Sequence, residues 1–105
     1  MRQAIIDQDI LLALDERLIK RLWKVDKTEY FPDGLEFAFQ YLYFDGNGWV
    51  QVARIDNQLH RGKPGTHIHI LKREKVSWEQ MAFEEAEKRI IEIGKSIIKN
   101  IIAKV

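Results

Sequence analysis

The side chains that could carry out chemistry are concentrated in one stretch of the chain, from Arg54 to His69. All three histidines lie in it. If residues 66–72 form a strand, the last two histidines project from the same side, because side chains alternate between the two faces of a strand. A loop that folds back would bring the first histidine and Arg54 close to them. We therefore predict His60, His67, His69, Arg54 and Asp56 as catalytic candidates, and Arg61, Lys63 and Asn57 as substrate-binding candidates.

One chemistry that fits these residues is cleavage of a phosphodiester bond. A neutral imidazole can remove a proton from a ribose 2′-hydroxyl, and a protonated imidazole can donate one to the leaving oxygen. Both forms are present near neutrality, because an unperturbed histidine has a pKa of about 6.5. Arg54 or Arg61 would stabilise the negative charge that develops on the phosphate oxygens. This reaction requires no metal, and no cofactor is predicted for it.

Two other interpretations of the same stretch stay open. A His-x-His pair with a further histidine and Asp56 matches the ligands that zinc, iron or nickel prefer, which would make this a small metal-binding domain. Alternatively the histidines face solvent on a strand, Asp56 and Asn57 cap a turn, and Arg54 pairs with Asp56, with no chemistry at all. A lone His-x-His motif is common, so its spacing alone does not separate these interpretations.

The composition excludes several classes of protein. A chain of 105 residues is long enough for one domain, and 46% hydrophobic with 31% charged residues is typical of a folded protein. There is no cysteine, which excludes disulfides, thiolate zinc sites and cysteine nucleophiles. The first residues lack the apolar stretch of a signal peptide, and no apolar run reaches the roughly 20 residues that span a bilayer. A cytoplasmic protein is the simplest expectation.

The net charge of +1 is unevenly distributed along the chain. From Arg54 to Lys75 there are six basic and two acidic residues, so this segment carries +4 and the remainder −3. A basic segment can meet the phosphates of RNA, although exposed lysine and arginine are the norm on any protein surface.

An α+β fold is predicted to position these residues, with an antiparallel meander of about four strands packed against one long C-terminal helix. Pro32-Asp33-Gly34 indicates a turn, because proline presets φ and glycine accepts positive φ. Alternating apolar residues predict a strand over residues 35–44, which the Asp45–Gly48 turn reverses into a return strand over residues 49–56. A loop over residues 57–65 and a further strand over residues 66–72 follow.

Hydrophobic spacing predicts the two ends of the chain. Near the N-terminus, apolar residues recur every four positions, which favours a short first helix or turn to about Glu16, then a strand to about Thr28. The C-terminal helix is predicted to begin at Ser77, as an N-cap with Gln80 three residues later. The recurring N-terminal residues are Ile6, Ile10, Leu14, Leu18 and Leu22, and the predicted buried stripe of the helix is Phe83, Ala86, Ile90, Ile93, Ile97 and Ile101.

A second set of apolar residues lies beside that helical stripe: Ile91, Ile98, Ile102 and Val105. They either widen the buried face or form an exposed strip that pairs with a second copy of the chain or with another protein. The alternative function that follows is a non-catalytic interaction module, which forms a homodimer or binds a partner through this helix.

Taken together, these motifs resemble the toxin-side proteins of the TumE family, which occur beside helix-turn-helix antitoxins. The likeness covers residues 32–70. In the family an Arg-Tyr-Asp-Asn-like motif precedes a histidine-containing end, and here Ile55 takes the place of the aromatic residue. The resemblance implies a toxin component of a toxin–antitoxin system, acting on RNA, with a DNA-binding antitoxin as partner. It rests on Pro32-Asp33-Gly34, Arg54-Ile55-Asp56-Asn57, His60 and His67-Ile68-His69.

Overall fold

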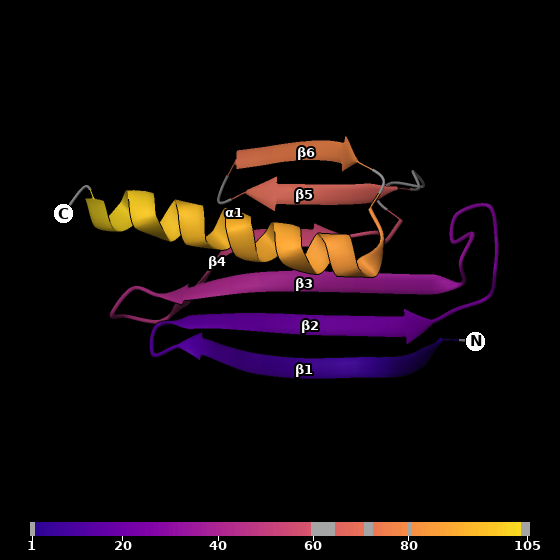
Figure 1. The fold of residues 1–105 in the computed structure, drawn as a ribbon, viewed down its shortest axis with the longest axis horizontal. Helices are drawn as coiled ribbons and strands as arrows, with labels where there is room; N and C mark the ends of the chain where they lie inside the picture. The colour runs from indigo at the N-terminus through magenta and orange to yellow at the C-terminus, as the bar shows by residue number, and fades with distance from the viewer. Residues whose placement is uncertain (1, 60–64, 71–72, 80, 104–105) are drawn as a thin grey trace.

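The chain forms one antiparallel sheet with a long helix on one of its sides in the computed structural model (Figure 1). The structure describes residues 2–59, 65–70, 73–79 and 81–103, and for residues 73–79 and 103 it describes the backbone alone. The predicted α+β class is confirmed, with six described strands rather than about four. The elements are β1 (Gln3–Ala13), β2 (Glu16–Lys24), β3 (Leu35–Phe44), β4 (Trp49–Asp56), β5 (Thr66–Ile70), β6 (Arg73–Glu79) and α1 (Phe83–Ala103).

The strands are hydrogen-bonded in chain order, so the sheet is a simple meander. The turn before β3 closes as predicted: Gly34 has a φ of 67° and donates its backbone N–H to the Phe31 carbonyl at 2.9 Å. The turn between β3 and β4 contains Gly46 with a φ of 99°. Positive φ is the region that glycine adopts without a steric penalty, so both turns need the residue that they have.

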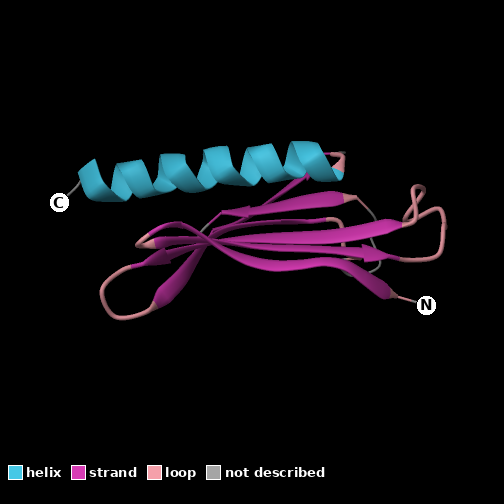
Figure 2. Cartoon of the chain, turned by 60° about the horizontal axis from the view of Figure 1, so that its bottom comes forward, coloured by secondary structure: helices cyan, strands magenta, loops and turns pink. Residues whose placement is uncertain are grey.

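The hydrophobic core lies between α1 and the face of the sheet that it covers, and the opposite face has no described helix over it (Figure 2). Alternate residues of β3 supply its centre, since Phe37, Phe39 and Tyr41 are almost completely buried. The aromatic rings of Phe39 and Phe83 are 5.0 Å apart between centroids, which joins the start of the helix to the middle of the sheet. Gly94 of α1 lies directly against the Tyr41 ring.

The prediction of a short N-terminal helix is wrong, because residues 3–13 form β1. Residues four apart share a face of a strand as well as of a helix, so that spacing satisfies both periods. The register resolves the ambiguity: β1 pairs with β2 so that Ile6 lies opposite Leu22 and Ile10 opposite Leu18. The recurring apolar residues of β1 and β2 therefore meet across a hairpin on the helix-covered face.

The predicted beginning of the C-terminal helix is also wrong. Ser77 lies in β6, opposite Ile68 of β5, and α1 begins only at Phe83. A capping-box pattern is a local preference, and pairing with a neighbouring strand overrides it. Gln80 lies outside the described residues. No helix among the described residues is both long and apolar enough to cross a membrane.

The buried face of α1 differs from the predicted stripe. Its most buried positions recur every four residues; two of them, Ala86 and Ile90, belong to the predicted stripe, and Ile98 belongs to the second set. Phe83, Ile93 and Ile97 of the predicted stripe are partly buried against the core. Ile101 and Ile102 at the end of the helix are exposed, and Val105 lies outside the described residues. Ile91 is half-buried against the core. The second set therefore partly widens the buried face and partly remains on the surface. The most buried positions are Ala86, Ile90, Gly94 and Ile98.

Candidate functional site

The pairing of β4 with β5 brings four of the predicted catalytic residues together. Arg54 lies opposite His69, and Asp56 lies opposite His67. The residues between them, Ile55 and Ile68, are also paired, but they point into the core under α1. Because side chains alternate along a strand, the two polar pairs project from the other face of the sheet. The predicted arrangement of the histidines on one side of a strand is confirmed.

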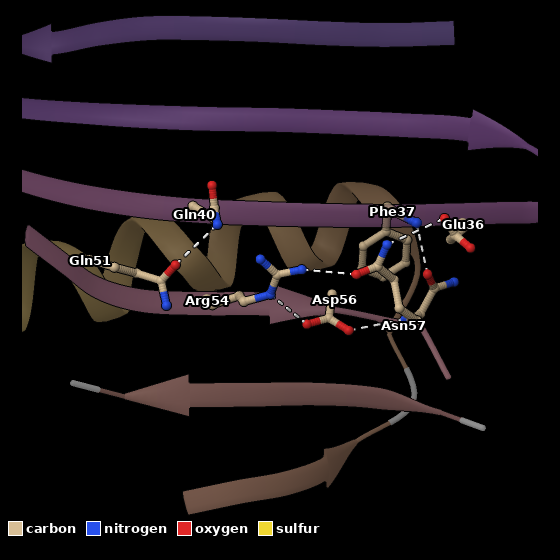
Figure 3. Close-up of polar contacts among 8 residues, drawn as sticks. Glu36, Phe37, Gln40, Gln51, Arg54, Asp56 and Asn57 are labelled. Atoms are coloured by element: carbon tan, nitrogen blue, oxygen red, sulfur yellow. Dashed lines mark hydrogen bonds and ion pairs between the residues drawn. The ribbon is translucent and has the colours of Figure 1, made fainter. Parts of the chain in front are cut away.

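Arg54 is held in position by two acceptors on its own side of the sheet (Figure 3). Its Nε donates to Asp56 Oδ2 at 2.9 Å, and its Nη2 donates to Gln58 Oε1 at 2.9 Å. The backbone N–H of Gln58 donates to the other oxygen of Asp56 at 3.0 Å. A guanidinium has five N–H donors in a rigid fork, so these two bonds fix its plane and leave further donors for an anion.

The two described histidines have different surroundings. Their rings are nearly parallel, at 13°, with 6.4 Å between the centroids. The His67 side chain is fully buried, whereas His69 is only half-buried. A general acid or base must come within hydrogen-bond reach of its substrate. In this structure His69 is half-buried on the open face, and fully buried His67 lies opposite Asp56.

Asn57, a predicted substrate-binding residue, is bonded to the backbone of β3. Its side-chain Oδ1 accepts from the Phe37 N–H at 2.7 Å, and its Nδ2 donates to the Leu35 carbonyl at 2.9 Å. Its own backbone N–H donates to the Phe37 carbonyl at 3.2 Å. These three bonds continue the β3–β4 ladder past the end of β4, which sets where Gln58 leaves the sheet.

Two residues of the site are absent from the sequence-based prediction. Gln58 bridges Arg54 to β3, because its Nε2 donates to Glu36 Oε2 at 3.4 Å. Glu36 in turn forms an ion pair with Arg2 at 3.0 Å. Gln58 directly follows the Arg54–Asn57 motif, so its position in the sequence could have identified it as a site residue. Glu36 is 22 residues away and becomes a neighbour only through the sheet register.

The charges on the described part of this face are balanced. Arg17 is paired with Asp9, and Arg21 with Asp7, as Arg2 is with Glu36 and Arg54 with Asp56. The hydrogen bond from Arg17 lowers the pKa of Asp9 below its ordinary value. The excess positive charge predicted from the sequence therefore comes from residues whose side chains are not described: Arg61, Lys63, Lys72, Arg73 and Lys75.

Three predicted site residues, His60, Arg61 and Lys63, lie outside the described residues. The approach of His60 to the other histidines stays a prediction. Among the residues that the structure describes, no group of three or more histidine, aspartate or glutamate side chains is placed to hold a metal ion. The metal-binding interpretation would therefore require a ligand from the undescribed part of the chain.

Comparison of this chain with known protein families, with curated proteins and with solved structures found no match. The resemblance to the TumE toxin family stays a prediction that rests on the motifs alone.

Proposed function

We propose that this protein is a cytoplasmic ribonuclease that serves as the toxin component of a toxin–antitoxin system, with its reaction centre at Arg54 and His69. The observation that supports it best is the fixed guanidinium of Arg54, held by Asp56 and Gln58 directly across the strand pair from a half-buried imidazole. An anion-binding fork beside a proton carrier is the minimum that phosphodiester cleavage needs.

The proposed reaction uses the 2′-hydroxyl of RNA as its nucleophile. Neutral His69 takes the proton of that hydroxyl, and the oxygen attacks the adjacent phosphorus. The bond to the 5′-oxygen of the next nucleotide breaks, which leaves a 2′,3′-cyclic phosphate. The departing oxygen takes a proton from a second acid, for which His60 is our candidate although it lies outside the described residues. Each proton and bond is thus accounted for without a metal.

Arg54 stabilises the additional negative charge of the transition state. Its orientation is set in advance by Asp56 and Gln58, so no reorganisation is needed when the charge develops. Asp56 is a positioning residue, because only 9% of its side chain is exposed and its oxygens bond Arg54 and the Gln58 backbone. Buried His67 packs behind His69 and also has a positioning role.

The test compares cleavage of a short single-stranded RNA with cleavage of the same sequence as DNA. We expect the RNA alone to be cut, with a cyclic phosphate end, because DNA lacks the nucleophile. His69→Ala should lower kcat by about 100-fold or more, the usual contribution of a general base. Arg54→Lys keeps the charge but loses the planar fork, and should lower kcat by about 10- to 100-fold.

Arg21→Lys is the matched control, because Arg21 is an ion-paired arginine on the same face, two strands away. It should leave cleavage unchanged. Wild-type protein that cuts neither polymer, or His69→Ala protein that cuts RNA at the wild-type rate, would exclude the proposal. In cells, induced wild-type protein should stop growth and the His69→Ala protein should not, and coexpression of an adjacent helix-turn-helix protein should restore growth.

A second candidate function has its own support at the other end of the molecule. Ile102 is 57% exposed at the end of α1, and Leu14, in the turn between β1 and β2, is 93% exposed. The β1–β2 turn and the last turn of α1 lie at the same end of the sheet (Figure 1). Exposed apolar residues at one end favour an interaction module that pairs two copies of the chain.

The variant that tests this pairing must spare the core. Ile98 is 4% exposed and Ile91 packs against the core, so lysine at either position would unfold the chain. Ile102→Lys should instead convert a dimer to a monomer in sedimentation without lowering the melting temperature. Ile5→Lys, at a position 53% exposed on β1, is the control. A wild-type protein that sediments as a monomer at all concentrations contradicts this function.

A further inference from the structure

A cavity of about 340 Å³ lies on the helix side of the sheet, away from the Arg54–His69 face. Its walls are the loop between β2 and β3, the end of β4, the beginning of β5 and the beginning of α1. Leu22, Phe37 and Phe83 line it with apolar surface, and the first two belong to the buried core. Small-molecule sites in proteins are typically concave, largely apolar and of about this volume or larger.

The loop that closes this cavity has an ordered hydrogen-bonded structure. The hydroxyl of Thr28 accepts from the backbone N–H groups of Tyr30 and Phe31 at 3.1 and 3.2 Å. At its base the Val25 N–H donates to the Gly34 carbonyl at 2.9 Å. A Cβ on Gly34 would come within 3.0 Å of the Val25 carbonyl oxygen, so this closure requires glycine. These bonds hold the loop in the conformation that forms one wall of the cavity.

The lining combines aromatic rings with carboxylates. Tyr30 and Phe31 join Phe37 and Phe83 as ring-bearing residues of the wall. The charged residues that line the cavity are all acidic, and no lysine or arginine is among the described lining residues. A cation is attracted both to carboxylates and to the negative face of an aromatic ring. The acidic lining residues are Glu29, Asp33 and Glu84.

The beginning of α1 opposes a cation at this position, but only weakly. The helix dipole is equivalent to about half a positive charge at the N-terminus, and Glu84 in the first turn offsets it. The three carboxylates together carry about six times that charge. Lys20, whose Nζ lies 5.5 Å from the centroid of the Phe83 ring, is paired with Glu87. Among the lining residues negative charge therefore exceeds positive charge, which disfavours an anion such as a phosphate.

We infer that this cavity binds a small organic ammonium ion, with its alkyl groups against the aromatic rings and its charge toward the carboxylates at the rim. Aromatic walls select an alkylated ammonium over a hydrated metal ion, because the alkyl groups remove water from apolar surface while the charge meets the rings. This binding is independent of the proposed ribonuclease activity, since the cavity and the Arg54–His69 pair lie on opposite faces of the sheet.

The test uses choline and its uncharged isostere 3,3-dimethylbutan-1-ol, which have nearly the same shape. In an NMR titration of the full chain, we expect choline to shift the resonances of Phe31 and Phe83, with the isostere at least tenfold weaker. Equal affinity of the two compounds, or no binding of choline at millimolar concentration, would overturn the inference. This comparison needs no variant and so does not depend on a substitution being tolerated.

Paired variants then separate the contribution of the carboxylates to choline binding from that of the aromatic rings. Glu84→Gln should weaken choline severalfold, whereas Glu85→Gln, one residue further along the same exposed helical turn and outside the lining, should not. Phe31→Leu keeps an apolar side chain but removes the ring, and should weaken choline at least fivefold more than it weakens the isostere. Equal effects of the two glutamate variants, or of Phe31→Leu on the two compounds, would contradict an ammonium site.

An alkylated ammonium group can belong to a free small molecule or to an alkylated lysine of another protein. Titration with Nα-acetyl-trimethyllysine methylamide distinguishes them. Tighter binding than choline identifies a protein side chain as the natural source, and weaker binding identifies a free ammonium compound.

Discussion

The two faces of the β4–β5 strand pair are built from adjacent residues and follow different rules. On one face Ile55 and Ile68 are almost completely buried against α1 and make only apolar contacts. On the other, Arg54 and His69 are partly exposed, and Arg54 is held by hydrogen bonds to Asp56 and Gln58. A shift of one residue in register would exchange the two faces completely, because side chains alternate with a period of two.

This contrast shows why stability and chemistry can be separated in so small a chain. Packing on the covered face is close, so any change in volume there is transmitted to the whole fold. Side chains on the open face are held mainly by pairwise polar contacts, whose net contributions are each about 1 kcal/mol. Substitutions that change side-chain volume on the covered face should therefore change the free energy of unfolding most, and substitutions that remove polar contacts, on either face, should change it less.

The largest effect is expected for Gly94→Ala on the covered face. A Cβ at Gly94 would lie 2.4 Å from Cγ of the Tyr41 ring. The helix and the sheet would have to move apart to remove this steric clash. We expect a loss of about 3 kcal/mol in the free energy of unfolding, at the upper end for overpacked cores. Urea denaturation followed by circular dichroism measures it.

Gly48→Ala is the control for this substitution, since a Cβ there meets no atom within 4 Å. It should change the unfolding free energy by less than about 0.5 kcal/mol, as surface substitutions usually do. If Gly94→Ala were as stable as Gly48→Ala, α1 would not pack directly on Tyr41. The packing on the covered face would then be less close than described.

The middle of the chain could be read from its sequence because local and global preferences agree there. Alternating aromatic residues in β3, the Gly46 turn and the polar alternation of Arg54 and Asp56 all point to the same hairpin. The facing of His67 and His69 followed from the same period of two. The pairing of these residues across β4 and β5 was not encoded in any local pattern, because it depends on the register after a loop.

The long C-terminal helix was predicted, but the first strand and the start of that helix were not, because competing patterns fit the sequence equally well there. The spacing of Ile6 and Ile10 fits a helix and a strand, and only pairing with β2 decides between them. Ser77 matches a helix N-cap pattern, but it pairs with β5 as part of a strand instead. The contacts of Glu36 with Gln58 and Arg2 illustrate the same limit, since they join residues that are distant in sequence through the completed sheet.

An intermediate effect is expected for Asp56→Ala, which removes hydrogen bonds on the open face. The carboxylate bonds both Arg54 Nε and the Gln58 backbone, so its removal leaves two partly buried donors without their acceptor. We expect a loss of about 2 kcal/mol in the unfolding free energy, within the usual range for such groups.

Asp7→Ala is the control on the same face, because the Asp7–Arg21 pair is exposed and such pairs contribute about 0–1 kcal/mol. Thermal or urea denaturation of both variants provides the measurement. Equal losses in the two variants would mean that Asp56 is no more than a surface ion pair, and its proposed role in fixing Arg54 would have to be abandoned.

The smallest effect concerns a side-chain hydrogen bond on the covered face. The hydroxyl of buried Tyr41 donates to Glu16 Oε1 at 2.5 Å. Burial first, and then this hydrogen bond and the charge of Glu16, raise the pKa of the Tyr41 phenol above its ordinary value. Tyr41→Phe removes the bond and should lower the unfolding free energy at pH 7 by about 1 kcal/mol.

The pH dependence of that difference gives a sharper result. A tyrosine whose pKa is higher in the folded state ionises first in the unfolded state, so its stabilising contribution is complete below an unfolded pKa of about 10 and declines as the pH rises above it. The stability advantage of the wild type over Tyr41→Phe should therefore shrink above about pH 10. Tyr43→Phe, on the same strand, is the control for the loss of a tyrosine hydroxyl, since the lysines are the same in all three proteins. A constant advantage across that window would mean that Tyr41 ionises equally in both states, and the covered face would then be open to water at its centre.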